Sequence, residues 1–207
     1  MTKLFIEPSS PLLKSKAEEV AIDAILSEPI QELIELMYAV ACGERTDTEK
    51  RVMVGLAAPQ IGVMKRLILV DVGVDRDRKN PGELKVFINP DILWASPEQE
   101  EGREGCYSVD ERLWAIVPRA TAIDIKAWDR HANLIQCRLT GFTARIFQHE
   151  RDHLDGIRFP DRIGEKGKFQ WVEKEHFAEY RKNWQSWPVY CPWKVWEAMR
   201  DGRPYHL

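Results

Sequence analysis

Long hydrophobic runs, a cysteine framework and an excess of positive charge are all missing from this 207-residue sequence. No apolar run approaches the roughly 18 residues that a helix needs to cross a bilayer. The formal net charge is −3, so no overall basic field attracts nucleic acid or an anionic membrane. We therefore expect no membrane insertion and no direct, sequence-specific binding of nucleic acid.

The cysteines are few and far apart, at Cys42, Cys106, Cys137 and Cys191. In a chain of this size, that spacing favours free thiols or a metal ligand over disulfides. The first twenty residues contain neither the apolar core nor the small-residue cleavage site of a secretory signal. We therefore expect a cytoplasmic protein.

Hydrophobic periodicity predicts helices combined with mainly antiparallel strands, which is an α+β domain. Residues 29–41 place apolar side chains on one helical face, with Pro29 in the first turn. Further patterns predict a helix from Thr143, as N-cap, to Leu154, with Gly156 after its end. The expected strands are 66–73, 84–93 with an interruption at Asn89-Pro90, and a hairpin of 121–130 with 133–141.

The last 40 residues differ in character from the rest. Residues 168–183 are charged and compatible with a helix. Five of the eight tryptophans lie from residue 171 onward, and they are Trp171, Trp184, Trp187, Trp193 and Trp196. We expect a catalytic domain over residues 1–165 and a helical, tryptophan-rich extension over 166–207 that packs on it. A binding or dimer surface is the alternative.

The stretch "HERDH", residues 149–153, carries the clearest chemical signal. On a helix, His149 and His153 point in directions about 40° apart, so both imidazoles can face one metal ion. Glu150 is well placed to take a proton from water on that ion. Two histidines alone do not complete a metal site, however.

Three residue types could supply the third ligand. A histidine further along the helix is excluded, because Phe159 stands at the required position. A downstream glutamate is compatible with the spacing, and Glu173, Glu175 and Glu179 are available. Cys106 in "REGCYSVDERLW" is equally compatible, since a thiolate can join two imidazoles around a divalent ion. The spacing does not choose between Cys106 and a glutamate.

Three separate stretches, in this order, resemble the motifs of the peptide deformylase family: "MVGLAAPQ" (53–60), "EGCYS" (104–108) and "HERDH" (149–153). The similarity extends over roughly residues 8–165, and "VPRA" (117–120) is a further match within it. It implies the deformylase fold, with antiparallel β-sheets around a central helix that bears the last motif. It also implies a metal-dependent hydrolase that removes the N-formyl group from N-formylmethionyl peptides of nascent proteins and releases formate.

The resemblance also implies a role for individual residues. Cys106, His149 and His153 would hold one divalent ion, usually Fe(II), which Zn(II), Ni(II) or Co(II) can replace. Glu150 would act as general base and acid. Gln60 and the backbone N–H of Tyr107 would stabilise the oxyanion. The substrate-binding residues that we expect are Val54, Gly55, Glu104 and Gly105, and the ribosome exit region is an expected partner. The resemblance assigns no specific peptide-binding arginine, and Arg112 is the nearest candidate in the sequence.

Three positions depart from the family pattern. Met53 replaces a glycine, Tyr107 replaces a leucine or similar residue, and Asp110 stands where a proline is common. These changes concern the substrate cleft and leave the metal ligands intact. They motivate one alternative, a deformylase-like hydrolase of another N-formyl or N-acyl substrate. A second alternative is a non-catalytic metal-binding interaction protein that uses the tryptophan-rich tail to bind a partner.

Overall fold

The computed structural model describes residues 5–43, 53–76 and 82–207. Two antiparallel sheets hold the strands of these segments. The five-stranded sheet has the order β1 (Gly55–Ala57), β2 (Leu67–Val72), β3 (Glu83–Ala95), β6 (Ala122–Trp128) and β7 (Leu134–Thr140). The three-stranded sheet has the order β4 (Gln99–Glu104), β5 (Leu113–Ala120) and β8 (Lys168–Trp171).

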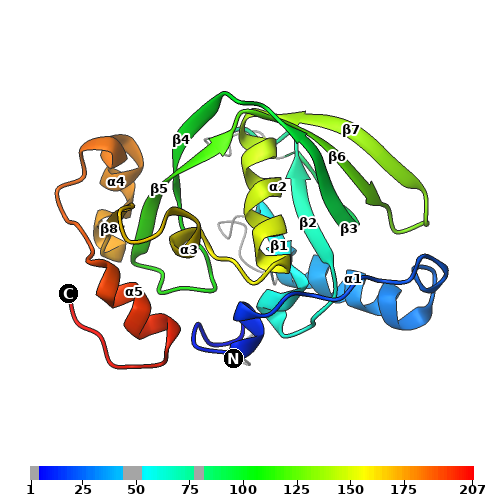
Figure 1. The fold of residues 1–207 in the computed structure, drawn as a ribbon, viewed down its shortest axis with the longest axis horizontal. Helices are drawn as coiled ribbons and strands as arrows, with labels where there is room; N and C mark the ends of the chain where they lie inside the picture. Colours follow the sequence, from blue (N-terminus) through cyan, green and yellow to red (C-terminus); the bar gives the residue numbers. More distant parts are fainter. Residues whose placement is uncertain (1–4, 44–52, 77–81) are drawn as a thin grey trace.

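The central helix α2, Gly141–Leu154, lies between the two sheets (Figure 1). Its apolar side chains join the core that β2, β3 and β6 line, and Phe147 packs edge-on against Phe87 of β3. Because protein surrounds α2 on several sides, even charged residues such as Glu150 and Asp152 are buried there. The predicted α+β fold, with antiparallel sheets around a central helix, is confirmed.

The first long helix, α1 (Glu28–Cys42), matches the predicted amphipathic helix. Pro29 lies in its first turn, where a missing backbone N–H costs nothing. The apolar positions of the repeat are buried against β1, β2 and β3, and they are Ile30, Leu33, Ile34, Met37 and Ala41.

Within the described residues, no helix is both long and apolar enough to span a membrane.

Strand β3 continues through Asn89-Pro90, so the predicted interruption there is wrong. The pairing with β6 shifts its register between Ile88 and Asp91, and Asn89 has a positive φ of 49°. The Asn89 side chain exchanges two hydrogen bonds with the backbone of Val20. A β-bulge therefore accommodates the Asn-Pro pair without ending the strand.

Helix α2 begins at Gly141 with Thr140 as its N-cap, so the prediction of Thr143 as N-cap is wrong. The Thr143 hydroxyl instead accepts a hydrogen bond from the backbone N–H of Gly73 at 3.2 Å. A contact with a distant loop thus replaces the expected local one. The predicted end is close to the observed one, because Gly156 has φ of 71° after the last turn.

The three-stranded sheet departs most from expectation. Strands β4 and β5 were not predicted, and residues 168–171 form strand β8 rather than the start of a helix. Phe169 and Trp171 are buried in β8, which pairs with β5. Contacts across this sheet outweighed the helical preference of a charged local sequence.

Helix α3 (Phe159–Ile163) follows α2. After β8 the chain forms two α-helices, α4 (Phe177–Asn183) and α5 (Trp193–Arg200), and two short 3-10 helices, Lys174–His176 and Trp184–Ser186. Trp171, Trp187 and Trp196 are buried, and Trp184 and Trp193 are partly buried. The segment 166–207 therefore shares both a sheet and a hydrophobic cluster with preceding residues such as Leu113. The division of the chain at residue 165 stays a prediction.

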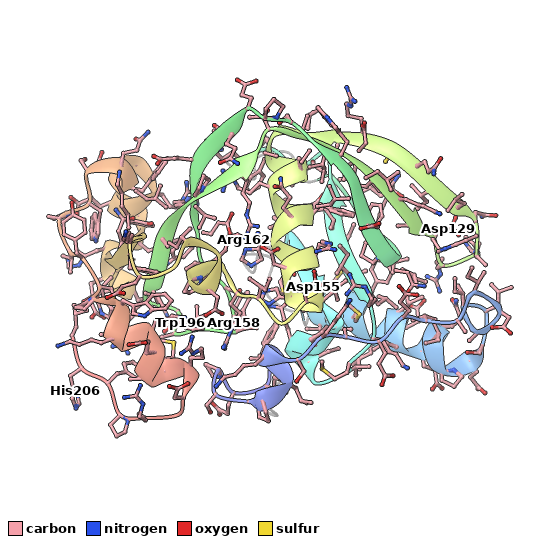
Figure 2. The ribbon with its side chains drawn as sticks, viewed as in Figure 1. Asp129, Asp155, Arg158, Arg162, Trp196 and His206 are labelled. Atoms are coloured by element: carbon pink, nitrogen blue, oxygen red, sulfur yellow. The ribbon has the colours of Figure 1, made fainter. Side chains whose placement is uncertain are left out.

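Trp196 of α5 is the most deeply placed of these tryptophans (Figure 2). Its indole N–H donates to the Asp161 carboxylate at 3.0 Å, and the Arg158 guanidinium lies 4.4 Å from its ring centroid. Arg158 is itself buried. The indole therefore covers a buried cation and attaches α5 to α3.

We predict that Trp196→Ala lowers the free energy of unfolding by about 3–5 kcal/mol, because it leaves a large cavity beside a buried guanidinium. Tyr190→Ala is the matched control, since the Tyr190 side chain is exposed, and we expect a change within about 0.5 kcal/mol. Urea unfolding of both variants measures the difference. Equal losses in the two variants would contradict this account of the C-terminal packing.

Candidate metal and active site

Cys106, His149 and His153 come together at the face of α2 that meets the end of β4. One donor atom from each residue lies within 4.8 Å of the other two, and Cys106 Sγ is 3.2 Å from His153 Nε2. Among the residues that the structure describes, no other group of histidine, cysteine and acidic side chains has this geometry. Glu173, Glu175 and Glu179 are not part of the group, so the geometry favours Cys106 as the third donor.

The donor set fits a divalent transition metal. A thiolate and two imidazoles suit Zn(II) and Fe(II), and three protein donors leave a coordination position for water or substrate. His149 Nδ1 lies 2.8 Å from Glu104 Oε2. Because a carboxylate only accepts hydrogen bonds, Nδ1 carries the proton and Nε2 is left for the metal.

Glu104 is the centre of a buried network of charges. Arg119 donates from Nε and Nη2 to its two carboxylate oxygens, at 3.0 and 2.9 Å. Arg145 donates to Oε1 at 2.8 Å and also to the backbone carbonyl of Val117. The three charged side chains are each at most 6% exposed. The network therefore fixes the carboxylate that orients His149.

The same network sets the protonation of its members. Burial alone raises the pKa of Glu104, but Arg119 and the hydrogen bond with His149 lower it well below its usual range. Burial and the nearby cations lower the pKa of His153, which keeps the imidazole neutral. The neutral form is the one that binds a metal.

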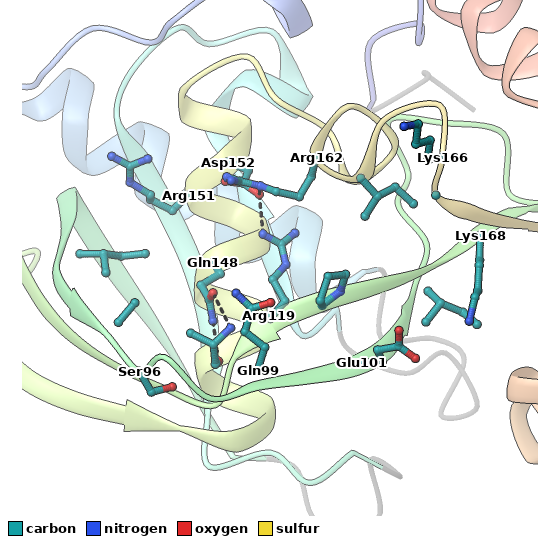
Figure 3. Close-up of a pocket in the computed structure, with 17 residues that line it drawn as sticks. Ser96, Gln99, Glu101, Arg119, Gln148, Arg151, Asp152, Arg162, Lys166 and Lys168 are labelled. Carbon is teal, nitrogen blue, oxygen red and sulfur yellow. Dashed lines mark hydrogen bonds and ion pairs between the residues drawn. The ribbon is translucent and has the colours of Figure 1, made fainter.

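Arg119 also connects the network to the far side of α2 (Figure 3). Its Nη1 donates to the Asp152 carboxylate, which pairs in turn with Arg162 of α3. These three residues line a cavity of about 610 Å³, where α2 meets β3, β5 and α3. Two carboxylates, those of Glu104 and Asp152, therefore fix the position of the Arg119 guanidinium.

Glu150 is buried beside the donors, with one carboxylate oxygen that has no hydrogen-bond partner. Burial raises its pKa to about 7. A Cβ atom on Gly55 of β1 would collide with this carboxylate. The small residue predicted in the first motif therefore makes room for Glu150, whose buried and unpartnered oxygen is free to exchange a proton.

The side-chain amide of Gln60 contacts the Cys106 sulfur. Its Oε1 accepts from the Ala57 N–H at 2.7 Å, and its Nε2 donates to Cys106 Sγ at 3.3 Å and to Ser108 Oγ at 3.2 Å. The bond with Ala57 fixes the orientation of the amide. The Gln60 amide N–H consequently points toward the Cys106 sulfur, which is one of the three candidate metal ligands.

Tyr107 directly follows Cys106, and its side chain is 64% exposed. The ring stacks on Phe5, with centroids 4.9 Å apart and planes 11° from parallel. The aromatic replacement at this position therefore contacts the N-terminal segment at the mouth of the site.

Asp110, the other departure in this region, binds Arg112 and accepts a hydrogen bond from the Tyr205 hydroxyl at 2.8 Å.

Beside Cys106 and Glu150 lies one cavity of about 800 Å³, a volume within the usual range of ligand pockets. Nearly all of the predicted site residues line it, namely Val54, Gly55, Gln60, Glu104, Gly105, Cys106, Tyr107, Arg112, His149 and Glu150. His153 is buried, 2% exposed, and is not one of the lining residues. Met53, the third departure, is a lining residue as well.

Sequence reasoning missed the supports of the site. Arg119 is part of "VPRA", which was noted as a motif match without a role, and Arg145 precedes the metal motif on α2. Nothing in the sequence around either arginine indicates that its side chain is buried. The one usable sign was the charge of Glu104 beside a motif cysteine, because a buried carboxylate requires a cationic partner.

Comparison with known proteins identifies relatives over most of the chain. The family model described as Polypeptide deformylase matches residues 3–169. Peptide deformylase 2 of Bacillus cereus is 38% identical over 171 residues, which cover 79% of this chain and 90% of that protein. Peptide deformylase of Pseudothermotoga lettingae is 36% identical over 160 residues, covering 77% and 81%.

Solved structures agree with these matches. The class I type b peptide deformylase of Acinetobacter baumannii, with Met-Ala-Ser bound, has a TM-score of 0.67 at 34% identity. The match covers 77% of this chain and 96% of that one. The Thermotoga maritima peptide deformylase has a TM-score of 0.59 at 34% identity, with the same coverage of each chain.

We predict that Cys106→Ser abolishes stable metal binding, because a hydroxyl is a far weaker donor than a thiolate. Glu173→Gln should retain the metal, since the Glu173 carboxylate accepts from the Trp171 indole instead. The metal-to-protein ratio after gel filtration gives the answer. The reverse pattern would show that a downstream glutamate is the third ligand.

We predict that Glu104→Gln costs roughly 3–5 kcal/mol of stability, because the buried Arg145 loses its carboxylate partner and the buried Arg119 keeps only Asp152. Metal affinity should fall by about 10–100-fold, since His149 loses its orienting carboxylate.

Glu100→Gln on the same strand is the matched control. The exposed pair of Glu100 with Arg76 should contribute at most about 1 kcal/mol. Urea unfolding and competition with a chelator measure the two effects. Wild-type stability and metal affinity in Glu104→Gln would contradict the proposed importance of the network.

Proposed function

This chain belongs to the polypeptide deformylase family and is an enzyme of that type, and we propose that Cys106, His149, His153 and Glu150 carry its reaction. The reaction is hydrolysis of the formyl amide of an N-formylmethionyl peptide, which yields formate and a free amino terminus. The observation that carries this proposal is the group of three donor atoms with the buried Glu150 carboxylate beside it. The relatives favour neither another N-acyl substrate nor a purely metal-binding role.

Cys106, His149 and His153 would hold one divalent ion, and we propose Fe(II) as the resident metal. When bound there, the ion lowers the pKa of a water molecule toward neutrality and polarises the formyl carbonyl. The mixed sulfur and nitrogen donor set supports Fe(II) and also accepts Zn(II), Ni(II) and Co(II). Metal supply therefore decides which ion is present.

Glu150 moves the proton. Its free carboxylate oxygen takes a proton from water as the oxygen of that water forms a bond to the formyl carbon. The protonated carboxyl then gives its proton to the amine nitrogen as the carbon–nitrogen bond breaks. Burial supports this role, because it keeps the carboxyl poised between its charged and neutral forms.

Gln60 and the backbone N–H of Tyr107 stabilise the charge that develops on the formyl oxygen. The Gln60 Nε2 group already faces the Cys106 sulfur, and the hydrogen bond from Ala57 holds it in that orientation. Neutral donors that need no reorganisation are effective in a site with little water. The same amide also braces the loop through its hydrogen bonds with Ala57 and Ser108.

The peptide lies along the cavity beside Val54, Gly55 and Gly105. Glu104 takes a different role from the substrate contact first expected, because Arg119, Arg145 and His149 occupy its carboxylate. We propose that it positions His149. The Acinetobacter relative with Met-Ala-Ser bound supports a peptidic occupant, since that tripeptide is what deformylation of formyl-Met-Ala-Ser leaves.

The biological substrate that we propose is the formylated amino terminus of a nascent protein. Such a substrate places the enzyme in the cytoplasm, near the region where chains leave the ribosome. The finding that the described part of the chain has no membrane-spanning helix is compatible with this location.

We predict that Glu150→Gln reduces formate release from formyl-Met-Ala-Ser by about 10²–10⁴-fold, because the isosteric amide cannot take the proton. The variant should keep its metal, since Glu150 is not a ligand. Glu179→Gln, an exposed substitution on α4, should retain wild-type turnover. A formate assay on metal-loaded proteins tests the proposal, and normal turnover by Glu150→Gln would refute it.

A further inference from the structure

The wall of the cavity that faces away from α2 comes from the C-terminal segment, which the family model does not match. The match ends at residue 169. Beyond it, Val172, Lys174, Phe177, Arg181 and Trp184 line the same cavity as Cys106 and Glu150. We refer to these five lining residues as the α4 wall. In Figure 1, α4 lies at the outer end of the three-stranded sheet, beside β5.

The α4 wall is anchored firmly next to the second motif. Trp114 of β5 lies directly over Gly105, where a Cβ atom would come within 2.9 Å of the indole. Phe177 packs against the Trp114 ring, with ring centroids 5.0 Å apart. Tyr180, on the same helix, is fully buried and donates to Gln170 of β8. The wall is therefore a fixed part of the cavity.

The charges on this side of the cavity are mainly positive. Lys174 and Arg181 from the α4 wall are joined by Arg103, which directly precedes Glu104 on β4. Glu111 is the acidic side chain that lines the same region. In the described part of the chain, no ion pair with a carboxylate involves Lys174. A substrate carboxylate near this wall would meet a net positive potential.

From this arrangement we infer that the α4 wall reads the charge of the peptide beyond its formylmethionine, and that it favours aspartate or glutamate there. The inference rests on the proposed function, because the peptide must place its formyl group at Cys106 and Glu150. The chain that follows must then leave through the rest of the same cavity. Phe177 and Trp184 supply apolar contact to that chain, and Lys174 and Arg181 supply the charge preference.

Matched peptides test the inference with the metal-loaded, full-length protein. The first pair is formyl-Met-Glu-Ser amide and formyl-Met-Gln-Ser amide, and the second is formyl-Met-Ala-Glu amide and formyl-Met-Ala-Gln amide. The members of each pair differ in one charge, and the amide removes the terminal carboxylate. At low salt we expect kcat/KM to be about three- to tenfold higher for the glutamate member of at least one pair. Added salt should reduce this ratio.

Variants assign the preference to the wall. Lys174→Gln combined with Arg181→Gln should bring the ratio close to one, and Lys174→Gln alone, at an exposed position, should reduce it. Lys182→Gln is the matched control, because Lys182 is exposed on α4 and does not line the cavity. It should leave the ratio unchanged.

Two results would overturn the inference while the proposed function stands. One is equal kcat/KM within both pairs for the wild-type protein, and the other is an unchanged ratio in the double variant. Absence of formate release from all four peptides would instead refute the proposed function, and the inference with it. The comparison therefore separates the two failures.

Discussion

The buried charge network around Glu104 is the constraint on which the rest of this molecule depends. A carboxylate placed under a protein surface is tolerated only if cations and hydrogen bonds compensate it. Arg119 and Arg145 provide that compensation, and both must be held in place from other elements. Asp152 of α2 and the backbone of β5 hold them. Strand β4, strand β5 and helix α2 are therefore locked together through charges at the point where the metal donors meet.

The position of α2 between the sheets explains how a polar site is kept in the core. One face of the helix packs on β2 and β3 through residues such as Phe147, while the other presents His149 and His153 to Cys106. Because α2 is enclosed, Glu150 is desolvated and one of its carboxylate oxygens has no hydrogen-bond partner, which suits the proton transfer that we propose for it. The same enclosure makes a glycine at position 55 necessary. Folding and chemistry thus place the same demands on this helix.

Local sequence patterns predicted the parts of the structure that depend on local physics. The helix over 29–41, the hairpin of β6 and β7, and the pairing of His149 with His153 follow from periodicity and spacing. The choice of Cys106 over a downstream glutamate required the motif resemblance, because spacing does not report distance in space. Strand β8 was mistaken for a helix, because it forms by pairing with β5, which is distant in the sequence, and its own residues do not indicate that pairing. Arg119 and Arg145 were missed for the same reason, as their partners lie 15 and 41 positions from them along the chain.

The central claim is that one thiolate and two imidazoles, oriented by the Glu104 network, form the metal site of this enzyme. X-ray absorption spectroscopy of the metal-loaded protein tests it most directly, because sulfur and nitrogen scatter at different distances from the ion. With zinc, the account predicts one sulfur at about 2.3 Å and imidazole nitrogens at about 2.0–2.1 Å. A first shell of nitrogen and oxygen without sulfur would contradict it.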